Sequence, residues 1–368
     1  MNLIILRTNL TDGLSSVERA VGENSNLPIL KNILIKASGD KINLISTNLE
    51  LAVESSVSGK ILEKGEITIP FSIFNSIIKN LNSERVAIEE KNKKIVISTD
   101  NYEASIQTQN IGDFPIIPSI ESGNGSLKIN KEDFKEALRK AAIAAQYSDI
   151  RPEISGVFLK YSDGALVFAA TDGFRLSEVK MLQKQTTGDS GDFSVIIPLK
   201  TTNEIMRMFN KDDEIEISVD ANQILFASKN EKLISRLIDG KFPDYQAVIP
   251  KDVQNEALVE KNELVNALKL ASAFSGKAND ITIKTGENKK FLEVYSADSA
   301  VGENCYRVPI KLKGDKFSLV FNWRYLLDGL KIYESKEIIL GVNSSDRPVV
   351  IKNPSEPSLI YVAMPIKN

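Results

Sequence analysis

Carboxylates, lysines and arginines are the side chains through which this sequence could do chemistry, because it contains no histidine and a single cysteine. The lack of histidine excludes Ser-His and Cys-His nucleophile systems and removes the commonest general base and metal ligand. Cys305, a lone cysteine that we expect to be buried, can form neither an internal disulfide nor a cysteine-based metal cluster. A site built from carboxylates or a reactive lysine remains open.

A metal-dependent phosphoesterase or nuclease is the enzyme class that such residues could serve, and it needs clustered carboxylates that hold divalent ions and activate water. Asp212 and Asp213 are adjacent, but their stretch is polar and has no partner motif, which favours a solvated turn. Asp172 and Asp298 recur at equivalent places in two segments, which indicates a shared turn rather than one catalytic site. The sequence therefore predicts a protein that is not an enzyme and holds no metal or cofactor.

The most distinctive motif is Thr171-Asp-Gly-Phe-Arg-Leu176. Asp-Gly is a strong turn signal and needs no further function. The matching place in an earlier segment is Thr47-Asn-Leu-Glu-Leu-Ala52, which has neither the glycine nor the arginine, so the fold alone does not demand them. We interpret the motif as a turn that carries an added function.

The elements that must position these residues are repeated along the chain. Ser46-Thr-Asn48 corresponds to Ala170-Thr-Asp172 at an offset of 124 residues, and Ser296-Ala-Asp298 belongs to a third copy. An apolar pattern of helical spacing precedes each copy: Leu10, Leu14, Val17 and Val21; Phe134, Leu138, Ala141 and Ala145; and Leu264, Leu268 and Ala271. A repeat of this length is a whole domain rather than a solenoid unit.

Each copy is expected to contain two helices, because a strand, an amphipathic helix and several further strands follow one another twice within it. The second halves begin at Glu66-Ile-Thr-Ile-Pro70, Ser194-Val-Ile-Ile-Pro198 and Ser318-Leu-Val-Phe-Asn322. About six helices among mainly antiparallel strands predict the α+β class. We place the domains at residues 1–122, 123–250 and 251–368, joined by proline-fixed segments. No apolar run is long enough for a signal peptide or a membrane span, which predicts a cytoplasmic protein.

Four motifs in the order found here resemble the bacterial DNA sliding clamp, the β subunit of DNA polymerase III, and the resemblance covers the whole chain. They are Leu27-Pro-Ile-Leu30, Ala170-Thr-Asp-Gly-Phe-Arg-Leu176, Ile238–Tyr245 with Val248-Ile-Pro250, and Tyr361-Val-Ala-Met-Pro-Ile366. The resemblance implies three clamp domains per chain and a head-to-tail homodimeric ring around duplex DNA, with helices lining the hole. It further implies a non-catalytic processivity factor of DNA replication.

The resemblance also implies where the two subunits meet. A closed head-to-tail ring needs complementary, non-identical faces on the first and third domains. The residues that match the family's interface are Ala104 and Ile106 on one face, and Ala273 and Phe274 on the other. An ordinary role as edge-strand and helix-end residues is the alternative for each of them.

A hydrophobic groove for short extended peptides is the added function that the resemblance assigns to the central motif. Its partners would be the DNA polymerase III α subunit, the clamp loader, other polymerases and repair proteins. The matching residues are Ile154, Thr171, Gly173, Phe174, Arg175, Leu176, Pro243, Val248, Pro348, Val362, Met364, Pro365 and Ile366. Aliphatic residues and methionine suit leucine or phenylalanine anchors, and Arg175 could offer its guanidinium to a peptide carbonyl or carboxylate. Phe174 stands where the family commonly has histidine, which predicts a preference for bulkier or more apolar partner motifs.

The formal charge of −3 is unlike that of a groove-reading DNA-binding protein. A ring that holds DNA topologically needs only weak, sequence-independent attraction, so we expect basic residues to gather on the helices. Lys131, Lys135 and Arg139 have the spacing of one helical stripe. The remaining candidates for the DNA-facing surface are Arg19, Lys79, Arg151, Lys200, Arg207, Lys269, Arg324 and Lys331. A protein-interaction scaffold that does not encircle DNA is the alternative; it explains the repeats and the groove but not the basic stripe.

Overall fold

The computed structural model describes residues 1–23, 26–92, 94–118, 120, 125–181, 185–188 and 190–367. The expected domain boundary between residues 122 and 123 lies outside the described residues. The chain forms two compact units. The first comprises Met1–Asp133, Gln185–Gly191 and Asn203–Leu237, and the second comprises Phe134–Lys184, Asp192–Thr202 and Ile238–Asn368.

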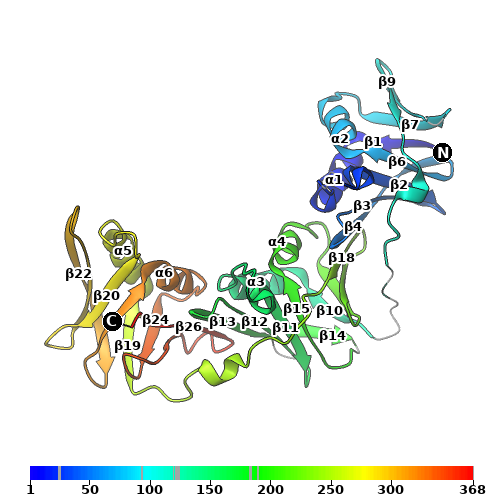
Figure 1. Cartoon of the computed structure of the whole chain (residues 1–368). Helices are drawn as coiled ribbons and strands as arrows, with labels where there is room; N and C mark the ends of the chain where they lie inside the picture. Colours follow the sequence, from blue (N-terminus) through cyan, green and yellow to red (C-terminus); the bar gives the residue numbers. More distant parts are fainter. Residues whose placement is uncertain are drawn as a thin grey trace. The chain divides into compact units, whose positions relative to one another are not determined.

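One sheet of the first unit is antiparallel and has five strands (Figure 1). In spatial order they are β5 (Gly59–Glu63), β1 (Asn2–Leu6), β7 (Arg85–Lys91), β8 (Lys94–Thr99) and β9 (Tyr102–Gln107). Burial alternates along β7 and β8, as expected for strands that face a core on one side. Strands β5 and β9 form the two edges of this sheet. Strand β9 carries Ala104 and Ile106, two of the residues predicted to contact the second subunit.

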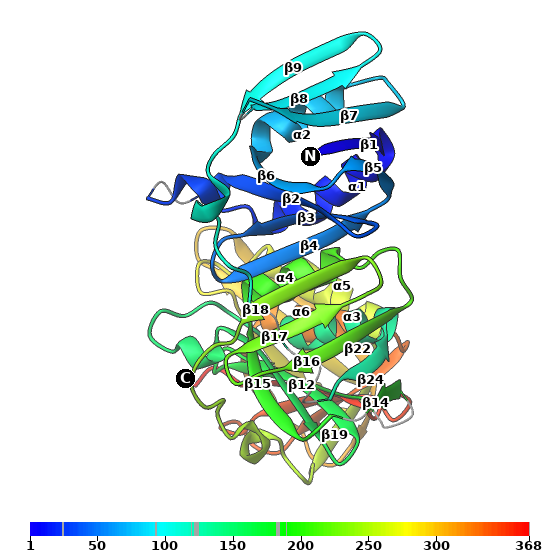
Figure 2. The ribbon, with the colours of Figure 1, turned by 90° about the vertical axis from the view of Figure 1, so that its right-hand side faces the viewer.

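The other sheet of the first unit has nine strands and continues from the first repeat into the second. In spatial order these are β14 (Thr186–Gly188), β10 (Leu127–Asn130), β16 (Glu214–Val219), β17 (Gln223–Ala227), β18 (Glu231–Arg236), β4 (Leu51–Val57), β3 (Lys41–Thr47), β2 (Asn32–Ser38) and β6 (Gly65–Pro70). Figure 2 shows β4 running beside β18, and Val53 pairs with Leu233 there. This pairing joins two repeats without a break in the ladder.

The second unit is built on a sheet of twelve strands. Their spatial order is β15 (Phe193–Pro198), β11 (Gly156–Ser162), β12 (Ala165–Thr171), β13 (Arg175–Met181), β26 (Leu359–Ala363), β25 (Val349–Lys352), β24 (Glu337–Val342), β19 (Asn255–Glu260), β22 (Gly302–Lys313), β21 (Phe291–Asp298), β20 (Asp280–Thr285) and β23 (Ser318–Asn322). Strand β13 of the second repeat pairs with β26 of the third, as β4 pairs with β18. The same kind of joint therefore occurs twice.

Six α-helices lie in the described part of the chain, which agrees with the prediction of two per repeat. They are α1 (Arg7–Val17), α2 (Phe71–Asn80), α3 (Lys131–Ala142), α4 (Leu199–Arg207), α5 (Lys261–Ser272) and α6 (Trp323–Lys331). Short 3-10 helices are η1 (Glu18–Ala20), η2 (Pro28–Lys31), η3 (Ile111–Asp113), η5 (Pro152–Ile154) and η7 (Tyr245–Val248). The predicted α+β class is confirmed.

Helix α5 illustrates how the sequence makes these elements. Leu264, Leu268 and Ala271 share one buried face at helical spacing. The side chain of Glu260 accepts hydrogen bonds from the amides of Asn262 and Glu263 and so caps the first turn. In Figure 1, α1 lies beside α2 in the first unit and α5 beside α6 in the second. Among the described residues, no helix is long and apolar enough to cross a membrane.

Candidate functional site

A groove of about 150 Å³ lies in the second unit where β13 pairs with β26. The predicted groove residues that line it are Thr171, Gly173, Phe174, Arg175, Leu176, Pro243, Val248, Val362 and Met364. Arg151, Asp244 and Tyr245 also line it and were not predicted for the groove. Four predicted residues, Ile154, Pro348, Pro365 and Ile366, are not among the groove's lining residues. Peptide binding by this surface stays a prediction.

The loop between β12 and β13 is fixed by its own side chains. Thr171 Oγ1 accepts a hydrogen bond from the Gly173 amide at 3.0 Å, and Asp172 Oδ1 accepts from the amides of Phe174 and Arg175 at 2.9 and 3.0 Å. Gly173 has a φ of +90°, a left-handed conformation that suits glycine. The Phe174 ring projects from this loop with 62% of its surface exposed. An apolar ring is therefore offered at the rim of the groove.

The same turn occurs in the first repeat without glycine. The Leu49 amide donates to Thr47 Oγ1 at 3.0 Å, the Leu51 amide donates to Asn48 Oδ1 at 2.8 Å, and Leu49 itself has a φ of +77°. The Thr-Asx turn is thus a feature of the repeated fold, as the recurrence of the motif indicated. What distinguishes the second repeat is the set of side chains that the turn presents.

Arg175 corrects one expectation. Its guanidinium was expected to be available to a peptide carbonyl or carboxylate. Instead, Nε donates to Asp172 Oδ2 at 3.0 Å and Nη1 donates to Asp328 Oδ2 at 2.6 Å. Its carbon Cζ lies 4.6 Å from the centre of the Tyr325 ring, and only 11% of the side chain is exposed. The exposed basic side chain of the groove is instead Arg151, which was predicted to face DNA and whose Nε donates to Glu153 at 3.1 Å.

Tyr245 lines the groove but was not among the groove residues predicted from the sequence. Its hydroxyl donates to Glu178 Oε2 at 2.6 Å, and the Glu178 side chain is only 2% exposed. Burial, and then the hydrogen bond to the Glu178 carboxylate, raise the pKa of the Tyr245 hydroxyl, which therefore stays a hydrogen-bond donor at pH values where a free tyrosine ionises. Phe242 packs edge-on against this ring at 5.9 Å. The signal was present, since Tyr245 ends the Ile238–Tyr245 motif, but its role was not assigned.

Most of the predicted DNA-facing residues on or beside the helices already have acidic partners. Arg19 pairs with Glu204 at 2.9 Å, and Arg207 pairs with the same glutamate at 3.6 Å. Further pairs are Arg139 with Glu136 at 2.6 Å and Lys331 with Asp328 at 3.9 Å. Arg139, Arg207 and Lys331 are exposed in these pairs, and exposed ion pairs are weak and can open toward phosphate at little cost, whereas the Arg19–Glu204 pair is more buried.

Lys131 is a second correction. Its side chain is buried at the start of α3, where Nζ donates to the Asn210 carbonyl at 3.3 Å and pairs with Glu132 at 3.2 Å. It therefore does not extend the stripe that Lys135 and Arg139 were expected to complete with it. By contrast, Lys79, Lys200 and Lys269 are exposed and make no ion pair within the described ranges. Arg324 is exposed and stacks over the Trp323 ring at 5.3 Å.

Two of the predicted subunit contacts lie on an edge strand, and the other two, Ala273 and Phe274, directly follow helix α5. Ala104 and Ile106 are on β9, an edge strand, although Ile106 is only 8% exposed and packs mainly within its own chain. Strand β22 pairs with β21 over residues 302–309 but with β19 only over 310–313, so its first part has an open edge in the described structure. Phe274 lies beside the start of this segment, because a Cβ on Gly302 would come within 4.0 Å of its ring. Cys305 is on the same strand and is exposed, contrary to the expectation that it is buried.

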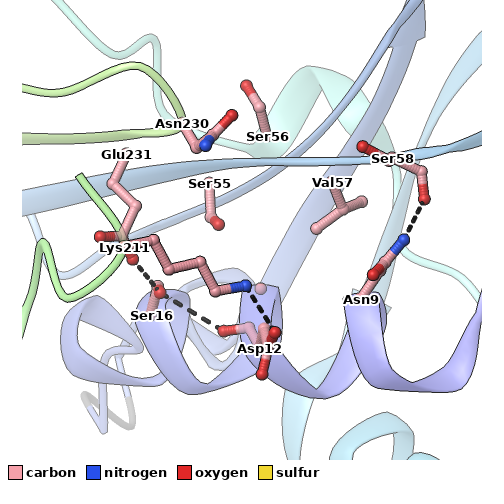
Figure 3. Close-up of a pocket in the computed structure, with 11 residues that line it drawn as sticks. Asn9, Asp12, Ser16, Ser55, Ser56, Val57, Ser58, Lys211, Asn230 and Glu231 are labelled. Carbon is pink, nitrogen blue, oxygen red and sulfur yellow. Dashed lines mark hydrogen bonds and ion pairs between the residues drawn. The ribbon is translucent and has the colours of Figure 1, made fainter.

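A second cavity, of about 120 Å³, lies at the β4–β18 joint in the first unit (Figure 3). Its lining is polar, and the groups satisfy one another: Lys211 Nζ pairs with Asp12 at 2.5 Å, and Ser16 donates to Glu231. Asn9 donates to the Ser58 carbonyl at 2.9 Å. We interpret the polar residues around this cavity as contacts that join the first repeat to the second, and not as a ligand site. In the described part of the chain, no three histidine, cysteine, aspartate or glutamate residues are placed to hold a metal ion.

Comparison with known proteins gives one family for the whole chain. The models of the DNA polymerase III beta subunit match in order: the N-terminal domain at residues 1–118, the central domain at 128–244 and the C-terminal domain at 246–367. The chain is similar to the beta sliding clamp of a Synechocystis species, with 28% identity over 100% of this chain and 99% of the relative. It is also similar to that of Bacillus subtilis, with 26% identity over the full length of both proteins.

Solved structures agree with this match. The crystal structure of the DNA polymerase sliding clamp from Bacillus subtilis has a TM-score of 0.94 and 26% identity, over 100% of this chain and 99% of that one. The beta subunit of the DNA polymerase of Streptococcus pyogenes also has a TM-score of 0.94, at 22% identity over the whole of both chains, which shows the shared fold.

Proposed function

Because this chain belongs to the DNA polymerase III beta subunit family, the beta sliding clamps, we propose that two copies close head-to-tail into a ring around duplex DNA. The chain serves DNA replication as a sliding clamp. The observation that carries this conclusion is the ordered match of three domain models to residues 1–118, 128–244 and 246–367. We also propose domain boundaries at residues 122/123 and 250/251, and a cytoplasmic location.

The proposed ring needs two unlike faces that are each open to a second copy. Within the part of the chain that the structure describes, strand β9 in the first unit and the 302–309 segment of β22 in the second each have unpaired backbone groups along one edge. An open strand edge is a template for pairing with another strand. The proposed contact adds β9 of one copy beside β22 of the next and packs Phe274 against the first domain. Two such contacts would close a dimer.

The proposed hold on DNA is topological, so the protein has no need of high affinity. Exposed lysines on three helices, Lys79, Lys200 and Lys269, supply positive charge that is not already paired in the described structure. Arginines such as Arg139 supply charge once their surface ion pairs open. The ring could then slide, because every phosphate offers the same attraction and no base is read.

Removing Lys200 and Lys269 together is expected to weaken the salt dependence of DNA binding without changing sequence preference. Each lost phosphate contact lowers the slope of log affinity against log salt by about 0.9. The measurement is fluorescence anisotropy with two unrelated duplexes across a salt series. The control Lys160→Ala removes one positive charge from strand β11, half of what the double variant loses, and should leave the slope unchanged. Equal slopes for the double variant and the wild type would contradict the DNA-facing assignment, and a strong preference for one duplex would contradict sequence-independent binding.

The groove is proposed to tether partner proteins by short extended peptides. Candidate partners are the α subunit of DNA polymerase III, the clamp loader, other polymerases and repair proteins. Its apolar lining, with Leu176, Val362 and Met364 beside the exposed Phe174 ring, suits aliphatic or aromatic anchors. A polymerase held this way stays near the primer end at high effective concentration. The chain would contribute no catalysis and require no cofactor for this role.

A further inference from the structure

Arg175 lines the groove but directs its charge away from it. Two of its N–H groups are bound to carboxylates, Asp172 at 3.0 Å and Asp328 at 2.6 Å, and its planar face covers the Tyr325 ring. A guanidinium that binds two separate carboxylates and stacks on an aromatic ring is not easily withdrawn to serve another acceptor. A peptide in the groove would therefore meet the edge of a residue whose charge is already neutralised.

Two of the three partners of Arg175 belong to a different repeat. Arg175 begins β13, whereas Asp328 and Tyr325 lie on α6 of the third repeat. Groove residues come from both sides of this joint: Thr171, Phe174 and Leu176 from the second repeat, and Val362 and Met364 from the third. The width of the groove is set by how the two repeats meet.

The connection from the groove rim to α6 is continuous. Asp172 Oδ1 holds the Phe174 amide at 2.9 Å, and its Oδ2 accepts from Arg175 Nε at 3.0 Å. Arg175 then binds Asp328 on α6 at 2.6 Å. The backbone closes the other side, because the Met364 amide donates to the Phe174 carbonyl at 2.8 Å. A shift of α6 would be passed to the loop that presents Phe174.

The joint between the first and second repeats contains the same kind of pair, and the cavity described beside it is mainly polar, unlike the groove at Arg175. Arg19 of the first repeat binds Glu204 at 2.9 Å, and Glu204 is the sixth residue of α4 as Asp328 is the sixth residue of α6. The cavity at that joint is lined by polar groups that satisfy one another (Figure 3). An arginine–carboxylate pair onto the second helix of the next repeat is thus a feature of the joints, independent of peptide binding.

We propose that Arg175 is a positioning residue, and that its ion pair with Asp328 holds the groove open in its peptide-binding shape by fastening the Thr171–Arg175 loop to α6. Arg175 acts through Phe174 and Leu176 and makes no charge contact with the peptide. This inference rests on the proposed peptide-binding function of the groove. It goes beyond that function because it makes the shape of the groove depend on Asp328, a residue that does not line the groove.

The test is the affinity of the fluorescein-labelled peptide SLSLFS for full-length dimer carrying Asp328→Asn. The positioning role predicts a dissociation constant raised about tenfold, because a partly buried arginine loses its fixed partner. Asp328→Glu keeps the carboxylate and should recover most of the affinity. Lys331→Gln, which removes the other ion-pair partner of Asp328 on the same helix, should change affinity less than about twofold.

The alternative role makes the opposite prediction. If Arg175 binds the peptide directly, Asp328→Asn frees its guanidinium, and affinity stays the same or rises; that result would overturn the proposal. Arg175→Lys should weaken binding of SLSLFS and of its acidic analogue SLDLFS by the same factor, and a larger loss for SLDLFS would also overturn it. The double variant Arg175→Lys/Asp328→Asn should lose little more peptide affinity than either single variant, because both changes break the same ion pair. This comparison still tests the proposal if one of the single variants is less stable. A wild-type protein that binds neither peptide would overturn the groove function and this inference with it.

Discussion

Phe274→Asp is expected to convert the dimer into a monomer. The proposed contact buries this ring against the first domain of the next copy, and an aspartate there would be an unpaired charge in an apolar interface. Such a change at an interface anchor costs about 4 kcal/mol, which raises the dimer dissociation constant about a thousandfold. Sedimentation velocity at micromolar concentration measures the outcome, and the monomer should lose its hold on DNA circles at the same time.

The matched control for this variant lies on β5, the edge of the five-stranded sheet that is opposite to β9 and outside the proposed contact. Leu62 lies on β5 and is 52% exposed, so Leu62→Asp adds the same charge to an exposed apolar site away from β9. This variant should remain dimeric. A Phe274→Asp protein that sediments as a dimer would place the interface elsewhere on the chain.

Met364→Asp is expected to abolish binding of a partner peptide while leaving the ring intact. The Met364 side chain lines the groove, whereas its backbone amide bonds to Phe174, so the substitution changes the surface without removing that bond. A charge facing an apolar anchor should lower peptide affinity about a hundredfold or more. Fluorescence anisotropy with the SLSLFS peptide measures this loss.

Met364→Leu is the corresponding control, because it keeps an apolar side chain of similar volume. Its affinity should lie within about threefold of the wild type. If Met364→Asp binds the peptide as well as Met364→Leu does, partners must dock outside this groove. Polymerase tethering would then need another surface.

The repeated architecture could be predicted because its signal is local. Apolar residues at helical spacing, such as Leu264, Leu268 and Ala271, determine which face of a helix is buried wherever the helix packs. Offsets between the copies then give the number of domains. The turn at Thr171 was also predictable, since Thr and Asx side chains bond to amides two or three residues away.

The partners of charged residues could not be predicted in the same way. Arg175 binds Asp328, which is 153 residues away, and no residue near Arg175 in the sequence predicts this partner. Lys131 has the spacing of a stripe with Lys135 and Arg139, but it starts α3 and turns toward the Asn210 carbonyl of another segment. Tyr245 was missed because a buried tyrosine with a carboxylate acceptor has no signature of its own. Long-range pairing decides these cases.

The claim that the protein encircles DNA is tested most directly by retention on nicked circular plasmid after loading by a clamp loader and ATP. Gel filtration in high salt, before and after the plasmid is linearised, separates topological from electrostatic association. A ring predicts that the protein stays on circles in high salt and is released when an end is cut. Equal, salt-sensitive binding to circular and linear DNA would contradict the ring and favour an interaction scaffold that never encloses the duplex.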